Sequence, residues 1–396
     1  MSRLFIPAVH LPHGREVFKP LPYRASQFRR VLKAYAERAL LQCSPEDAIV
    51  LAAAPEKDYL RFLADNGMGT ERIILCPGAG ANLAADIPLQ DIAGQLKDRG
   101  TPNFYIHLEE EREIARTLGA RERVMHPALT RMFNTAYFLR RLEEDMDIPT
   151  PVRAQVRSSR FAEPVRELLK EHGKLFVRGN ESCGGTQTFT VEHEEDIGSI
   201  VRIIGRNRAI TRYFVSPFLA IDESWNVQYA IGPDGVPWLF GASRQIMDGT
   251  AHKGNEGGAE MPPDVVALAE ATARRLASMG AMGIIGIDFI TAGANTFIAE
   301  INARENTSTP VIAAAQKVGA RHWRSFKIPA ARGFTFAAFT ALCGKENLLS
   351  AAGGGGRGLL PFHFAASSLT GWLDVAAFGG SPEEVASLES RVLPVV

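Results

Sequence analysis

The sequence predicts an α/β N-terminal domain with a Rossmann-like start, followed by an α+β region that carries the chemistry. In the first part, apolar stripes at helical spacing alternate with short, fully apolar runs that are typical of buried strands. In the second part, strand-like segments follow one another, separated by glycine- and proline-containing turns. The acidic residues of special interest lie in the last two of these segments.

Composition limits the classes of function. The chain has 396 residues, 46% of them hydrophobic, which is enough for two or three domains. Lys plus Arg and Asp plus Glu are 44 each, so no basic excess favours nucleic acid or a membrane surface, and small-molecule partners are expected. Cys43, Cys76, Cys183 and Cys343 show no metal-ligand spacing, which fits a reducing, cytoplasmic setting. No export signal or membrane segment is readable.

The first 125 residues read as helices and strands in alternation. Helical stripes cover residues 28–43 and 56–67, and apolar runs typical of strands cover residues 47–55 and 72–80. Helix and strand in alternation favour a parallel sheet with crossover helices.

A glycine-rich hairpin is expected between residues 174 and 193. Small residues in its loop leave backbone N–H groups unobstructed, and such a loop can wrap phosphate oxygens: Ser182, Gly184, Gly185 and Thr186. Arg178, on the strand before the loop, adds a fixed positive charge. The alternative interpretation is a turn without a ligand.

A second hairpin is expected over residues 286–304, where polar residues interrupt two apolar runs. Alternate residues of a strand face the same side, so a turn of odd length gathers one apolar face: Ile285, Ile287, Phe289, Phe297, Ala299 and Ile301. The opposite face then brings together Asp288, Glu300 and Asn302. The sequence therefore predicts a cluster of two carboxylates and one amide.

Two carboxylates about 4 Å apart repel by roughly 4 kcal/mol at an effective dielectric constant of about 20, so they need a proton or a cation between them. All three side chains offer oxygen, which suits Mg²⁺ or Mn²⁺ better than zinc. A magnesium ion in such a site usually accompanies nucleotide phosphates. The alternative is a hairpin with incidental acidic residues on a solvated face.

The order of glycine hairpin, connecting strand and "DFITAGANTFIAEIN" resembles the ATP-grasp superfamily of carboxylate–amine ligases. The whole chain resembles the peptide-ligase branch with a pre-ATP-grasp domain, as in pheganomycin-type ligases. This resemblance implies a pre-ATP-grasp domain over residues 1–125 and an ATP-grasp domain over 126–320, with a lid at about 150–212. Residues 321–396 then form a C-terminal extension of helices and strands.

The resemblance also implies roles for individual residues. Asp288, Glu300 and Asn302 would bind Mg²⁺, and Arg178 with the glycine loop would close over the triphosphate. Arg304 and Arg244 would face the acyl phosphate. The nucleoside would lie against Pro217, Phe218, Leu219 and Glu223. The chain departs from the family at two positions where a lysine is usual, which here are Ala136 and Arg178.

The expected function is an ATP- and Mg²⁺-dependent ligation of a carboxylate to an amine through an acyl phosphate, with Mn²⁺ as the other candidate ion. The resemblance implies amino acids or small peptides as substrates and, since family members are often dimers, a homodimer. Two alternatives stay open. One is a degenerate ATP-grasp protein that binds nucleotide without ligation, and the other is a kinase that lacks the amine step.

Overall fold

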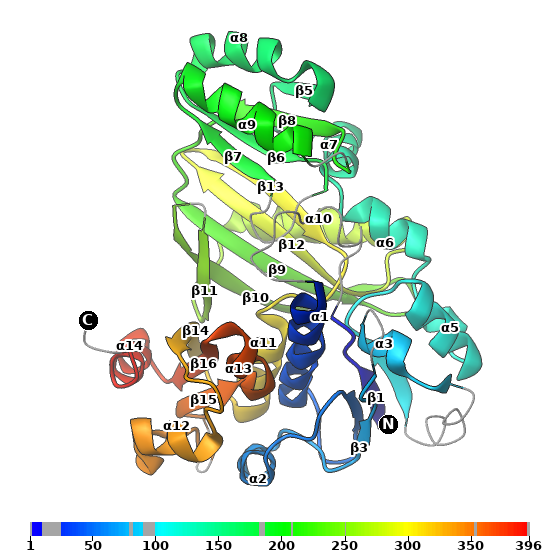
Figure 1. Cartoon of the computed structure of the whole chain (residues 1–396), viewed down its shortest axis with the longest axis vertical. Coiled ribbons are helices and arrows are strands. Elements are labelled where there is room, and N and C mark those ends of the chain that lie inside the picture. The colour runs from blue at the N-terminus through cyan, green and yellow to red at the C-terminus, as the bar shows by residue number, and fades with distance from the viewer. Residues whose placement is uncertain are drawn as a thin grey trace.

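The computed structural model describes residues 2–9, 25–78, 82–89, 100–181, 187–206, 209–249, 251–351 and 355–393. The strands in these residues form two four-stranded sheets and one eight-stranded sheet. Figure 1 shows one small sheet with its helices at the top, the large sheet in the middle, and the N- and C-terminal parts side by side at the bottom.

The N-terminal sheet is parallel, with the strand order β3-β2-β1-β4. Its strands are β1 (Arg3–Ile6), β2 (Ala48–Leu51), β3 (Ile73–Leu75) and β4 (Thr101–Phe104). Its helices are α1 (Ala25–Ala34), α2 (Lys57–Asp65) and α3 (Leu83–Asp86). The helix predicted over 28–43 is confirmed only as far as Ala34, because residues Tyr35–Leu41 form a buried 3₁₀-helix.

A second sheet forms what we call the lid, residues 154–217. The helices α5 (Glu109–Thr117), α6 (Pro127–Phe133) and α7 (Ala136–Asp145) lead into it. The lid elements are β5 (Ala154–Arg157), α8 (Ala162–His172), β6 (Leu175–Gly179), β7 (Thr188–Val191), α9 (Glu194–Arg206) and β8 (Arg212–Pro217). The strand order is β5-β8-β6-β7, all antiparallel, and α8 and α9 cover the outer face (Figure 1). The predicted glycine hairpin is therefore the pair β6 and β7.

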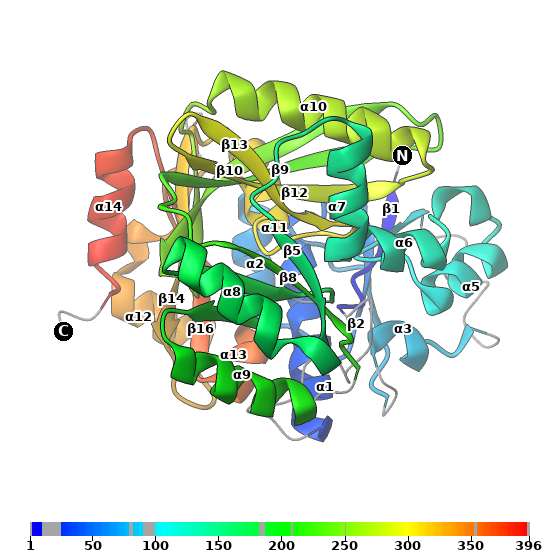
Figure 2. The ribbon, with the colours of Figure 1, turned by 90° about the horizontal axis from the view of Figure 1, so that it is seen from above.

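The main sheet is antiparallel in the order β13-β12-β9-β10-β11-β14-β16-β15. Its first strands are β9 (Glu223–Ile231), β10 (Pro237–Asp248), β11 (Ala251–Gly257), β12 (Gly283–Ala292) and β13 (Asn295–Asn302). Helix α10 (Pro263–Ser278) lies across one face of these strands (Figure 2). Trp225, Val227, Ile287 and Phe289 are buried beneath it in one hydrophobic core, which leaves the other face open for polar side chains.

The C-terminal strands extend the main sheet. They are β14 (His322–Pro329), β15 (Gly358–Phe362) and β16 (Trp372–Gly379), and the helices around them are α11 (Thr309–Val318), α12 (Phe336–Cys343), α13 (Phe364–Thr370) and α14 (Pro382–Ser390). Because β14 pairs with β11, strands on both sides of residue 320 belong to one sheet. This part also shares a hydrophobic core with the N-terminal sheet, in which Phe5 and Leu40 belong to the same cluster as Phe339 and Phe378.

No helix in the described part of the chain combines the length and the apolar character needed to cross a bilayer.

The junction between β11 and β14 depends on a glycine. A Cβ atom at Gly254 would lie 2.0 Å from the backbone carbonyl oxygen of Ser325, so the two strands cannot keep this spacing with a larger residue. We expect Gly254→Ala to lower stability by about 1–3 kcal/mol, because backbone atoms must move. Urea unfolding followed by circular dichroism measures the loss. The control is Gly205→Ala in α9, where no atom lies within 4 Å of the added Cβ. Equal midpoints for the two variants would contradict the tight junction.

A buried carboxylate joins the N-terminal part to the end of β13. Glu305 is 3% exposed and accepts a hydrogen bond of 2.8 Å from Gln42 Nε2. Its backbone N–H donates to the carbonyl oxygen of Tyr105, 2.9 Å away. Burial raises the pKa of Glu305 to about 7, and the Gln42 amide offsets this only in part.

The stability contributed by Glu305 should depend on pH. Because its folded-state pKa lies above the unfolded value, this contribution is full at about pH 4 and is lost as pH rises through about 7. We expect Glu305→Gln to gain stability relative to the wild type between pH 5 and pH 8, as measured by urea unfolding at both. A difference between the two proteins that is the same at both pH values would show that Glu305 does not titrate in this window.

Candidate functional site

The hairpin of β12 and β13 places the predicted acidic residues opposite each other. Asp288 pairs with Glu300, and Gly286 pairs with Asn302, so the predicted hairpin is confirmed. The predicted turn of odd length is wrong, because the strands are joined by the two residues 293 and 294. A β-bulge at Ala299 compensates for this even-length turn. Ala299 has no partner on β12, so the pairing shifts by one residue and Asp288 lies opposite Glu300.

The bulge also changes the apolar face. Ile298 pairs with Phe289 and packs in the core under α10 together with Ile287 and Ile301. Phe297 and Ala299 were expected in this core and are not part of it. The extra residue inserted at the bulge reverses the alternation of every residue between it and the turn.

Amide groups surround Asp288. Its Oδ1 accepts hydrogen bonds from Asn226 Nδ2 at 2.6 Å and from Gln245 Nε2 at 3.3 Å, and its Oδ2 accepts one from Asn302 Nδ2 at 3.0 Å. Burial, followed by the Glu300 charge, raises the pKa of Asp288 well above its usual range. A nearby cation would stabilise the ionised form of Asp288, because its charge offsets the cost of burial and the repulsion from Glu300.

Arg178 from the lid reaches the same hairpin. Its Nη2 lies 3.0 Å from Glu300 Oε1, and its Nη1 donates to the carbonyl oxygen of Ala299. The Arg178 side chain is 16% exposed, so this ion pair is better shielded from water than a surface pair. The bulge therefore also provides the backbone acceptor that ties the lid to the acidic residues.

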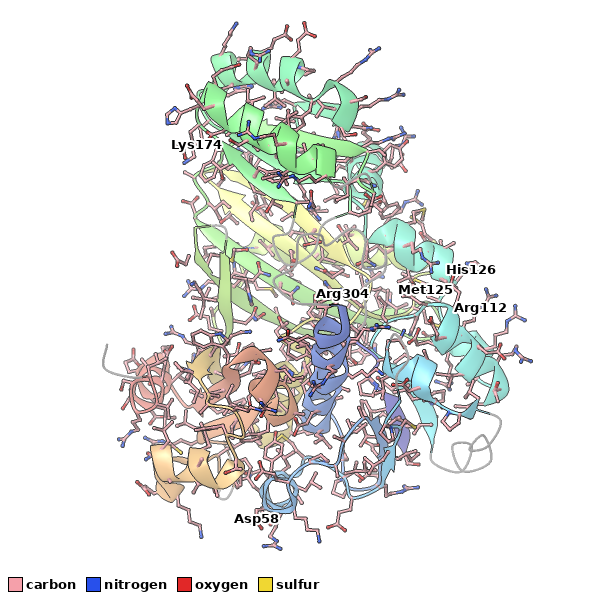
Figure 3. The ribbon with its side chains drawn as sticks, in the orientation of Figure 1. Asp58, Arg112, Met125, His126, Lys174 and Arg304 are labelled. Atoms are coloured by element: carbon pink, nitrogen blue, oxygen red, sulfur yellow. The ribbon has the colours of Figure 1, made fainter. Side chains whose placement is uncertain are left out.

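Arg304 lies at the other end of the cluster. Its Nη2 donates to Asn302 Oδ1 at 2.7 Å, and its Nη1 donates to the carbonyl oxygen of Glu305 at 3.0 Å. Figure 3 places Arg304 near the middle of the molecule. Two guanidinium groups from different parts of the chain thus flank two carboxylates.

The residues predicted to line the adenine slot lie where the lid joins the main sheet. Pro217 ends β8, Phe218 is 39% exposed, and Leu219 is partly exposed. The ammonium group of Lys174, labelled in the lid in Figure 3, lies 4.1 Å from the centre of the Phe218 ring. The predicted loop residues Ser182, Gly184, Gly185 and Thr186 lie outside the described residues.

Arg244 is not brought together with the acidic residues. It pairs with Trp225, and Trp225 pairs with Phe289, so its side chain is on the face opposite to Asp288. There it contacts Glu256 Oε1 through Nε at 2.6 Å and Glu223 Oε1 through Nη1 at 3.2 Å. Glu223, the predicted ribose ligand, lies on this same face.

Three amide residues were missed by the sequence interpretation. Asn226 and Gln228 alternate with Trp225 and Val227 along β9, and this polar–apolar alternation was the available signal. Gln245 is adjacent in sequence to Arg244 but faces Asp288. Asn226 and Gln245 donate hydrogen bonds to Asp288, and Gln228 donates one to Asn226.

Ala136 is the first residue of α7 and is 7% exposed. Its N–H donates to the carbonyl oxygen of Asn180, 2.9 Å away, which connects α7 to the end of β6. The helix therefore brings no cationic side chain to the lid at this position.

The donor set fits a magnesium ion bound together with phosphates. In the described part of the chain, no three His, Cys, Asp or Glu side chains form a group able to hold a metal ion. Two carboxylates instead suit Mg²⁺, which usually takes one or two carboxylates and completes its octahedron with water and phosphate oxygens. The amide oxygen of Asn302 accepts from Arg304 here, so it would join the metal ligands by turning away from that arginine.

Comparison by sequence gives no relative: no family model matches the chain, and no curated protein matches it. Comparison by structure does. Biotin carboxylase from Campylobacter jejuni matches with a TM-score of 0.58 at 12% identity, over 99% of this chain and 90% of that one. Phosphoribosylamine–glycine ligase from Thermotoga maritima matches with a TM-score of 0.55 at 14% identity, over 99% and 95%.

An N5-carboxyaminoimidazole ribonucleotide synthetase in complex with ADP matches with a TM-score of 0.56 at 9% identity, over 99% of this chain and 95% of that one. These matches extend over nearly the whole chain, so they include the N-terminal sheet, the lid and the main sheet together. At such low identity they establish the architecture alone. The chain has the fold that these proteins share.

Proposed function

We propose that this chain is an ATP- and Mg²⁺-dependent carboxylate–amine ligase. The observation that carries the proposal is the cluster in which Asp288 faces Glu300 and Arg178 of the lid contacts Glu300. An ion pair between two incidental surface residues would not need a bulge, three amide donors and a second arginine around it. The shared fold supports the same class, since ligases are among the structures it resembles.

Bound Mg²⁺-ATP would supply the phosphoryl group that activates a substrate carboxylate, after which an amine displaces phosphate. Asp288, Glu300 and Asn302 would hold the metal ion. Positioning and charge neutralisation dominate phosphoryl transfer, so the protein has little covalent work to do. The task of the chain is to hold charges in place and to keep water out.

The two arginines would divide this work. Arg178 would exchange its contact with Glu300 for phosphate oxygens, and a guanidinium can bind two such oxygens at once. Arg304, fixed by Asn302, would stabilise negative charge on the reacting carboxyl group. Arg244 is left out of this scheme because it lies on the other face of the sheet.

We further propose that residues 1–125 correspond to a pre-ATP-grasp domain and that the chain belongs to the peptide-ligase branch. The parallel order of β3-β2-β1-β4 supports the first part. Amino acids or small peptides would then be the substrates, and Pro217, Phe218 and Leu219 would contact the nucleoside. Glu223 is left out for the same reason as Arg244, with which it is paired on the other face of the sheet. A homodimer in the cytoplasm is the corresponding working hypothesis for assembly and location.

Removing either acidic charge should remove most of the turnover. Asp288→Asn and Glu300→Gln keep the side-chain volume, so we expect ADP formation with Mg²⁺, ATP and a panel of acids and amines to fall roughly 100-fold. The control is Glu256→Gln, a carboxylate that also binds arginines but faces away from the cluster. Wild-type turnover in either acidic variant would show that the metal assignment is wrong.

Mass spectrometry of the product separates the ligase, which gives an amide, from a kinase, which gives a phosphorylated acceptor.

The lid arginine should matter through its charge and its shape. We expect Arg178→Ala to raise the KM for ATP about tenfold and Arg178→Lys to raise it less, because lysine keeps the charge but binds a single phosphate oxygen. Steady-state kinetics at saturating Mg²⁺ measure both. Equal and negligible effects of the two changes would mean that the lid does not contact phosphate through this residue.

A further inference from the structure

A chain of buried polar side chains runs from the loop after β13 to Asp288. We call it the amide relay, and its members are at most 2% exposed: Thr309, Gln228, Ser308 and Asn226. Hydrogen bonds connect each member to the next, so the relay carries no unpaired polar end inside the protein. It lies on the face of the main sheet that carries the candidate site.

The hydrogen bonds of the relay run in one direction. The backbone N–H of Asn306 donates to Thr309 Oγ1 at 2.7 Å, and the Thr309 hydroxyl donates to Gln228 Oε1, 2.6 Å away. Because Gln228 Oε1 faces Thr309, Gln228 Nε2 faces Asn226 and Ser308. It donates to Asn226 Oδ1 at 2.7 Å and to Ser308 Oγ at 2.8 Å.

The relay fixes which atom Asn226 presents to Asp288. Asn226 Oδ1 accepts from Gln228 and also from Ser308 Oγ at 3.2 Å, so this oxygen is turned away from the cluster. Only Nδ2 faces Asp288, and it donates to Oδ1 at 2.6 Å. The amide cannot flip without breaking this whole set of bonds, which gives Asn226 a defined role as a donor.

Counting lone pairs shows what this leaves for a metal ion. A carboxylate oxygen offers about two acceptor positions. On Asp288, Oδ1 uses both, one for Asn226 and one for Gln245. Gln245 is itself held by Ser224 Oγ, which lies 2.5 Å from its Oε1. Oδ2 accepts only from Asn302, so one position on Asp288 stays open.

Calcium and magnesium differ in how they use such a carboxylate. Ca²⁺ takes six to eight oxygens and readily binds a carboxylate through both of them, whereas Mg²⁺ takes single oxygens in a strict octahedron. A carboxylate that has one oxygen fully occupied by hydrogen bonds therefore favours Mg²⁺ over Ca²⁺.

We propose that the amide relay, acting through Asn226, makes the site discriminate against Ca²⁺ in favour of Mg²⁺, because it withholds Oδ1 of Asp288 from bidentate coordination. The inference rests on the metal site of the proposed function. Asn226 is in this view a positioning residue, since it contacts a metal ligand and not the substrate.

The test measures metal binding without turnover. Mn²⁺ bound to the full-length protein in the presence of a non-hydrolysable ATP analogue is followed by electron paramagnetic resonance and displaced with MgCl₂ or CaCl₂. Three variants are compared with the wild type: Asn226→Ala removes the donor, Thr309→Val removes the start of the relay without touching Asp288, and Asn66→Ala is the control. Asn66 is 5% exposed and holds two backbone hydrogen bonds, both in another part of the molecule.

We expect the ratio of Mg²⁺ to Ca²⁺ affinity to fall roughly tenfold in Asn226→Ala, to fall less in Thr309→Val, and to stay unchanged in Asn66→Ala. An unchanged ratio in Asn226→Ala, or an equal loss of both ions, would overturn the inference and leave the metal site standing. Absence of Mn²⁺ binding by the wild type would overturn the metal site and the inference together. Thr309→Val keeps the test decisive if Asn226→Ala does not fold.

Discussion

Asp288 and Glu300 face each other across one rung of the β12–β13 hairpin, and the surrounding structure compensates for their mutual repulsion. Two arginines supply opposite charge, with Arg178 on Glu300 and Arg304 on the neighbouring Asn302. Amide donors supply hydrogen bonds to Asp288. Hydrogen bonds to an ionised group contribute about 1.5–3 kcal/mol each, but burial works against them, so the pKa of Asp288 still stays raised. A bound cation would offset the remaining cost of burying Asp288 next to Glu300.

This constraint explains several features of the fold. The bulge at Ala299 brings the two acids into register and exposes a carbonyl oxygen to the lid arginine. Helix α10 and the apolar face beneath it keep the hairpin rigid from the other side. The C-terminal strands continue the main sheet and share a core with the N-terminal sheet, so the site is attached to parts of the chain that are distant in sequence. A charge cluster on an isolated hairpin would have no such support.

Local pattern was sufficient for the elements but not for their irregularities. Alternation along residues 286–304 predicted the hairpin, because strand periodicity alone indicates it. The convergence of Asp288 with Glu300 also depends on the bulge, which took the place of the expected turn of odd length. The bulge was not predictable, since it depends on how β13 packs against the core. Because of it, Ile298 lies in the core under α10 in place of Phe297 and Ala299. Arg244 is a similar case. A register shift between Leu239 and Gly241 decides which face it occupies, and no local pattern reports that shift. The contact between Arg178 and Glu300 joins residues from different sheets, which only the tertiary fold defines.

We propose that Asp288, Glu300 and Asn302 bind a magnesium–nucleotide complex. Anomalous diffraction from crystals grown with Mn²⁺ and a non-hydrolysable ATP analogue locates the ion. We expect a manganese peak within coordination distance of oxygen atoms from both carboxylates, with the analogue's phosphates between the hairpin and Arg178. Nucleotide density without a peak at this hairpin, or a peak bound by other residues, would contradict it.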